Sequence, residues 1–85
     1  MPLEELIDDP LTWIVVRFEG GRIDPLRFRW HQREFSVKET LSIRLDRSVR
    51  PHRMFFSVAV TTGEVVELQK REGDPVWILS RIQTD

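Results

Sequence analysis

The side chains that titrate nearest to neutral pH are the two histidines, His31 and His52. Neither stands at metal-ligand spacing from a second histidine or a carboxylate pair, so we expect surface histidines and no metal site. The chain has no cysteine, which excludes thiolate zinc sites, disulfides and thiol catalysis. It also contains no G-x-S-x-G and no phosphate-binding glycine loop. We therefore predict a protein that is not an enzyme and has no cofactor.

Arginine is the residue type with the greatest capacity for recognition, because its planar guanidinium binds carboxylate or phosphate in a bidentate manner. Residues 22–53 hold nine basic residues against four acidic ones, in a chain with 13 basic and 14 acidic residues overall. This segment could contact an anionic partner, or its arginines could pair with neighbouring acids on solvated strand faces. The candidate nucleic-acid or anion contacts are Arg27, Arg29, Arg33, Arg44, Arg47, Arg50 and Arg53.

Length and composition limit the class of protein. Eighty-five residues, of which 40% are hydrophobic and 32% charged, predict one small globular domain over residues 1–85. No apolar run approaches the ~20 residues of a membrane span, and the acidic N-terminus lacks the basic region of a signal peptide. We expect a cytoplasmic protein without a membrane partner or a small-molecule substrate. The dense Arg and Glu, without Cys or Asn, are typical of thermophile proteins and predict a Tm above ~45–65 °C.

Most of the chain alternates apolar and polar residues with the period of two that a half-buried strand requires. Only short turns separate these segments, which favours antiparallel neighbours. We predict an all-β fold, a small antiparallel meander of six to seven strands over residues 11–82, curled into a half-open barrel. Residues 2–9 differ: a proline at the start and apolar residues on one side predict a short N-terminal helix.

Turn signals place the strands more closely. The Gly-Gly pair at 20–21 predicts a hairpin turn. The His-Gln pair at 31–32 has the length of a second one, although neither residue favours positive φ, so a longer loop or a bulge is the alternative. Residues 35–45 are long for one strand, and we expect a bend near residues 39–40, as where a sheet curls.

Strand parity divides the apolar residues into two sets. The set expected to form the core comprises Ile14, Val16, Phe18, Leu26, Phe28, Trp30, Phe35, Val37, Leu41, Ile43, Phe56, Val58, Val60, Val66, Leu68, Ile78 and Ile82. Trp13, Phe55, Val65, Trp77 and Leu79 fall on the opposite parity. A patch of exposed apolar residues on a monomer is a typical interaction site. We therefore predict a protein interface at Trp13, Phe55, Trp77 and Leu79, and slightly favour a symmetric homodimer.

A series of residues along the chain also matches a known pattern. They are Pro25, Arg27, Phe28, Trp30, Arg33, Phe35, Val37, Glu39 and Leu41, and then Phe56, Val58, Gly63, Glu67, Leu68, Trp77, Leu79, Arg81 and Ile82. Over about residues 12–82 the chain resembles an uncharacterised bacterial family of small all-β proteins, a domain of unknown function with an R-F-x-W-R-G-R-type hairpin. His31-Gln32 replaces the usual Arg-Gly turn, and the segment after Leu41 lacks the family's tryptophans. The chain is also similar to a C-terminal module of some Y-family polymerase-like proteins, which implies an accessory role in DNA repair or replication.

Two functions therefore stay open. The first is a non-catalytic protein-interaction module that binds another protein, or a second copy, through an exposed strand edge and the apolar patch. The alternative is a nucleic-acid-binding small β barrel that uses the basic segment 22–53. The positions of Phe28 and Trp30 weigh against it, because these rings lie on the opposite strand face from Arg27 and Arg29.

Overall fold

The chain folds into one open sheet of seven antiparallel strands. The computed structural model describes residues 3–84, with side chains from residue 5 onward, and contains no helix in that range. The strand order is β1-β7-β6-β5-β4-β3-β2, so each strand from β2 to β7 pairs with its sequence neighbour and β1 adds beside β7. The all-β meander predicted from the sequence is confirmed. The strands are β1 (Leu3–Pro10), β2 (Trp13–Glu19), β3 (Arg22–Trp30), β4 (Arg33–Asp46), β5 (Arg53–Val60), β6 (Val65–Arg71) and β7 (Trp77–Thr84).

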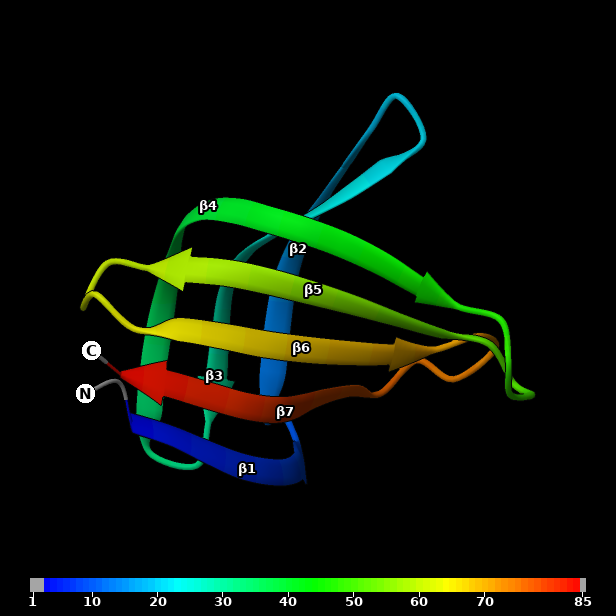
Figure 1. The fold of residues 1–85 in the computed structure, drawn as a ribbon. Coiled ribbons are helices and arrows are strands. Elements are labelled where there is room, and N and C mark those ends of the chain that lie inside the picture. Colours follow the sequence, from blue (N-terminus) through cyan, green and yellow to red (C-terminus); the bar gives the residue numbers. More distant parts are fainter. Residues whose placement is uncertain (1–2, 85) are drawn as a thin grey trace.

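The sheet bends into two layers that share β4. Figure 1 shows β5, β6, β7, β1 and the C-terminal part of β4 side by side, with β2, β3 and the N-terminal part of β4 crossing behind them. The register between β4 and β5 shifts between Val37 and Glu39 and again between Thr40 and Ser42. Bulges of this kind bend a strand and increase its twist. The bend predicted near residues 39–40 is therefore confirmed, and it allows one strand to serve both layers.

Both predicted hairpin turns have two residues. Gly20 and Gly21 have φ values of 58° and 77°, the left-handed conformation that a type I′ turn requires at both positions. The second turn joins Trp30 to Arg33, and its first residue, His31, has a φ of 55°. Asp9 lies 3.1 Å from the His31 ring, and this contact helps to hold a side chain at a position that favours glycine.

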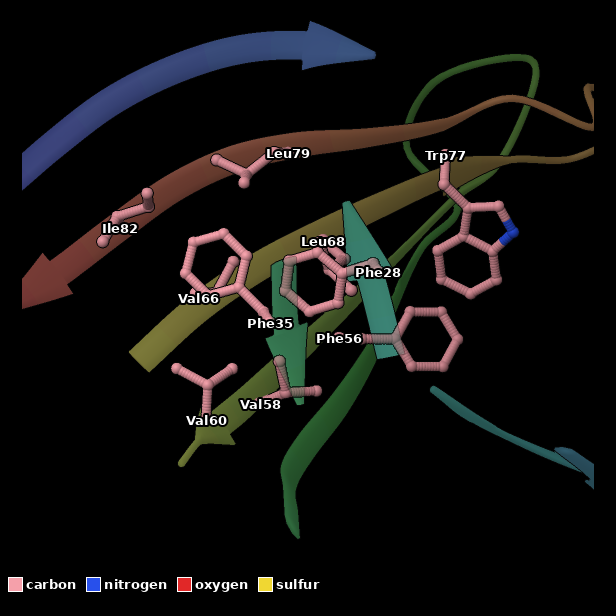
Figure 2. Close-up of a cluster of buried hydrophobic side chains, with 10 residues drawn as sticks. All are labelled: Phe28, Phe35, Phe56, Val58, Val60, Val66, Leu68, Trp77, Leu79 and Ile82. Atoms are coloured by element: carbon pink, nitrogen blue, oxygen red, sulfur yellow. The ribbon is translucent and has the colours of Figure 1, made fainter. Parts of the chain in front are cut away.

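Aromatic and branched side chains from both layers meet in the core (Figure 2). Phe28 and Phe35 stack with ring centroids 4.9 Å apart, and Phe56 lies 5.0 Å from Trp77. Full burial of one such side chain contributes about 1.5–3 kcal/mol, so this cluster is the main source of stability. Its members are Phe28, Phe35, Phe56, Val58, Val60, Val66, Leu68, Trp77, Leu79 and Ile82.

The predicted N-terminal helix is wrong where the structure describes it. Residues 3–10 form β1, which pairs antiparallel with β7, and residue 2 lies outside the described residues. An isolated helix of this length is marginal in water. Pairing with β7 instead supplies a ladder of backbone hydrogen bonds and lets Ile7 pack against the core.

The assignment of Trp77 and Leu79 to the outer face is also wrong. The β6–β7 register shifts so that Glu67 pairs with Arg81 and Leu68 pairs with Leu79, which leaves Ser80 unopposed. This bulge reverses the parity of β7, and both Trp77 and Leu79 point into the core with exposures of 7% and 0%. The patch on which the homodimer was inferred therefore does not exist, and the oligomeric state stays a prediction.

Four residues expected in the core, Phe18, Leu26, Leu41 and Ile43, are exposed, and Phe18 is 71% exposed. Leu26 and Leu41 are the unopposed residues at register shifts in the β2–β3 and β4–β5 ladders. Phe18 and Ile43 are exposed because β3 and β4 pair only as far as Arg27 and Ser36 and then separate, which leaves this end of the inner face without a facing layer.

Candidate functional site

The C-terminal part of β4 has one free edge. Between residues 37 and 46 its ladder within the described chain is with β5 alone, because β3 has already left its other side. Leu41, Ile43 and Leu45 lie along this edge with exposures of 50%, 40% and 45%. A long exposed edge with apolar side chains is a template for an additional strand.

The two outermost edges of the sheet are less suited to strand addition. β1 contains Pro10, is irregular between Leu6 and Asp9, and carries acidic side chains. β2 is shorter and carries Arg17 and Glu19 near its end. Prolines, bulges and charges are the features that block pairing at an edge. The free part of β4 also carries charged residues and two register shifts, but from Ser42 to Asp46 its ladder with β5 is regular, and Ile43 and Leu45 are exposed there. We therefore take this segment as the candidate edge.

A cavity of about 690 Å³ opens beside this edge. It lies between the β2–β3 hairpin and the neighbouring ends of β4, β5 and β6. Its apolar wall is formed by Phe18, Ile23, Leu45 and Met54. This volume lies within the range of about 300–1,000 Å³ found for ligand pockets. The cavity exists because the inner face of β4 and β5 continues beyond the point where β3 diverges.

Charged side chains surround the same end of the molecule. The cavity is also lined by Arg47, Lys70 and Arg71. Lys70 lies on the inner-facing row of β6 and donates to the backbone oxygen of Asp74 at 3.0 Å. This contact holds the ammonium group in place without neutralising it, because a carbonyl oxygen carries no full charge.

The acidic groups nearby are already engaged. His52 Nδ1 lies 3.0 Å from Glu72 Oε2. Ser48 donates to Asp46 Oδ1 from its hydroxyl at 2.6 Å and from its backbone N–H at 2.9 Å. The Ser48 hydroxyl is the main cause that lowers the pKa of Asp46, and nearby Arg44 and Arg53 act in the same direction. The acidic side chains therefore only partly compensate the local positive charge.

The structure divides the seven arginines singled out in the sequence into two groups. Arg44, Arg47, Arg50 and Arg53 lie at the end where the cavity opens. Arg27, Arg29 and Arg33 lie on the paired parts of β3 and β4, so the seven do not form one surface.

The second group is largely occupied within the domain. Arg33 makes a two-pronged contact with Glu64 at 2.6 and 3.2 Å, which raises its pKa and lowers that of Glu64. Arg29 donates to Glu34 at 3.2 Å. Arg27 lies over the Trp13 ring, 5.8 Å from its centroid. The predicted alternative, in which these residues pair with neighbouring acids, thus applies to Arg29 and Arg33.

The predicted interface residues do not come together. Trp77 and Leu79 are in the core, whereas Trp13 and Phe55 are half-buried on different layers. Phe55 instead contacts one of the arginines at the cavity end, because the Arg44 guanidinium lies 4.3 Å from its ring centroid.

Several residues of this site were missed in the sequence. Lys70 and Arg71 lie outside the basic segment 22–53, and Met54 and Ile23 carry no motif. The run of exposed apolar residues in β4 was visible as an alternating pattern. Nothing in that pattern indicates that β3 leaves β4 after Ser36, because the separation depends on how the two layers pack.

Two further features are absent from the part of the chain that the structure describes. No group of three or more His, Asp or Glu side chains there could hold a metal ion. No helix among residues 3–84 has the length and hydrophobicity to cross a membrane. No family model, curated protein or solved structure matches the chain. The resemblance to the small all-β family stays a prediction.

Proposed function

We propose that this domain is a non-catalytic protein-interaction module that binds an extended segment of another protein as an added strand along the free edge of β4. The observation that carries the proposal is the unpaired stretch from residue 37 to 46 with Leu41, Ile43 and Leu45 exposed along it. Strand addition obtains affinity from main-chain hydrogen bonds and specificity from pockets for alternate side chains. The free edge offers the main-chain hydrogen-bonding groups, and the adjoining cavity offers a pocket for side chains.

Nucleic-acid binding has weaker support. Aromatic rings that stack on bases must be accessible, yet Phe28 and Phe35 stack on each other inside the core. The arginines are also divided between two regions, and Arg29 and Arg33 are already paired. An apolar groove with one free sheet edge fits an extended polypeptide better than a phosphate backbone.

The test is capture from the native cell extract on immobilised domain, at low and at high salt, after nuclease treatment. The edge variant is Leu45→Lys, which places a charge at the groove beside Lys70 and Arg47. The matched control is Leu6→Lys, at a leucine that is 79% exposed on β1. Circular dichroism verifies that both variants are folded.

We expect a protein that is retained by the wild type and by Leu6→Lys, and lost by Leu45→Lys. Backbone amides of residues 37–46 should become protected from hydrogen exchange in the complex, because the added strand occupies the free edge. Capture of nucleic acid that is released by salt would contradict the proposal. Equal capture by both variants would contradict it as well.

A further inference from the structure

Ion pairs are unevenly distributed over this domain. Away from the cavity, most arginines have acidic partners at short range, with Arg33–Glu64 and Arg81–Glu67 at 2.6 and 2.7 Å, whereas Arg27 lies over the Trp13 ring. At the open end, six cations have no carboxylate oxygen within 4.0 Å among the described side chains. They are Arg44, Arg47, Arg50, Arg53, Lys70 and Arg71. Cations without an ion-pair partner therefore gather around the cavity and the adjoining part of the β4 edge, where acidic side chains compensate them only partly.

Two of these cations have buried donors without an acceptor. Arg53 and Arg71 are direct neighbours across the β5–β6 ladder, and the Nε atom of each is buried without a hydrogen-bond partner among the described residues. A buried donor without a partner destabilises the fold, because its hydrogen bonds to water are lost and not replaced. An acidic group of a partner placed beside these two guanidinium groups would be favourable.

The side chains along β4 alternate between two environments. Ile43 pairs with Phe56, on the side of the sheet that faces the core and cavity. Arg44 pairs with Phe55 on the outer side, and its guanidinium lies over that ring. A strand added beside β4 must alternate in the same way, because successive side chains of a strand point to opposite faces.

The required chemistry of an added strand follows from these two environments. Its inner side chains lie beside Ile43 and Leu45 and point toward the apolar cavity. Its outer side chains lie beside the row of Ser42, Arg44 and Asp46, and an acidic side chain beside Arg44 is favourable because opposite charges on cross-strand neighbours attract. We infer that the partner of this domain is an extended acidic segment in which apolar residues alternate with Glu or Asp. This inference rests on the proposed function and specifies its partner.

The probes are three short synthetic peptides with blocked ends. One alternates Glu and Val, the second alternates Lys and Val, and the third has the composition of the first with its Glu and Val in separate blocks. Binding is followed by backbone amide NMR of the wild-type domain, which reports both affinity and location. We expect the alternating acidic peptide to bind along residues 41–46, at least about tenfold more tightly than the other two.

The charge variant is Arg44→Gln, and the matched control is Arg27→Gln. Both arginines are exposed and lie over an aromatic ring, but Arg27 is on β3, where it pairs with Ser36 and lies outside the 41–46 segment. Arg44→Gln should weaken the acidic peptide about tenfold and reduce its salt dependence, whereas Arg27→Gln should leave the affinity unchanged.

Each result decides a separate point. Equal binding of the acidic and basic peptides, or of the alternating and block peptides, would overturn the inference. So would binding of the acidic peptide at β1 or β2. If Leu45→Lys abolishes partner capture from extract while these peptides show no preference, the inference fails and the proposed function stands. If Leu45→Lys has no effect on capture, the proposed function itself fails.

Discussion

Arg53 and Arg71 face each other directly across the β5–β6 ladder, and neither has a carboxylate oxygen within 4.0 Å among the described side chains. The other cross-strand neighbour of Arg53 is Asp46, whose Oδ1 accepts two hydrogen bonds from Ser48. Like charges directly opposite in a sheet destabilise it. The repulsion between Arg53 and Arg71 therefore lowers the stability of the sheet at the end where we place the partner.

Removal of one of these charges should stabilise the free domain. We expect Arg71→Gln to raise the free energy of unfolding by about 0.5 kcal/mol at low salt, because it relieves the repulsion with Arg53. The gain should shrink at high salt, since both arginines are partly exposed and salt screens the repulsion between them. Urea unfolding at two salt concentrations measures both effects. A loss of stability at low salt would show that Arg71 is better compensated than its geometry indicates.

The burial of Leu79 can be tested by truncation. Leu79→Ala should lower the free energy of unfolding by about 2–5 kcal/mol, because it leaves a cavity in the packed core. Leu6→Ala is the control, and its effect should stay within about 0.5 kcal/mol, since Leu6 is largely exposed. Similar small effects of both substitutions would contradict the bulge at Ser80.

The Arg33–Glu64 pair predicts a specific dependence of stability on pH. Hydrogen bonds from Arg33 are the main cause that lowers the pKa of Glu64 from its ordinary value of 4.5. A carboxyl whose pKa is lower in the folded state stabilises the fold above pH 4.5, and this contribution is lost as the pH falls through the folded pKa. Glu64→Gln should therefore lower stability at pH 7 and flatten the loss of stability below pH 4.5.

Thermal unfolding between pH 7 and pH 3 measures this dependence, and carboxyl NMR of Glu64 measures its pKa directly. Glu34→Gln serves as the control, because Glu34 is exposed and makes one contact with Arg29 at 3.2 Å. An unchanged acid profile in Glu64→Gln would show that the pair contributes nothing to the fold.

The turn at residues 20–21 tests the backbone conformation alone. Gly21 has a φ of 77°, and a Cβ placed there would meet no atom within 4 Å. Gly21→Val should therefore cost about 1–2 kcal/mol through the left-handed conformation and not through a clash. Gly21→Asn should cost less, because Asn tolerates this region. Equal losses in urea unfolding would exclude the left-handed conformation as the cause.

Local pattern was sufficient for the secondary structure of most of the chain. The alternation of apolar and polar residues identified the strands, and the Gly-Gly and His-Gln pairs marked both two-residue turns. The excess length of residues 35–45 indicated the bend in β4. Each of these features is decided by the sterics of a few neighbouring residues, so the sequence alone contains it.

The faces of the strands were decided by long-range pairing. One unopposed residue, Ser80, reverses the parity of β7 and moves Trp77 and Leu79 from the expected surface into the core. Residues 3–10 form a strand because their backbone pairs with the edge of β7.

The site depends on the same kind of information. The sequence showed a basic segment, but the layers of the sheet divide its arginines and add Lys70 and Arg71 from a distant strand. The free edge and the cavity arise because β3 leaves β4 after Ser36. The register shift in β7 and the packing of the two layers are set by contacts between segments far apart in the chain, and no local pattern of residues encodes them.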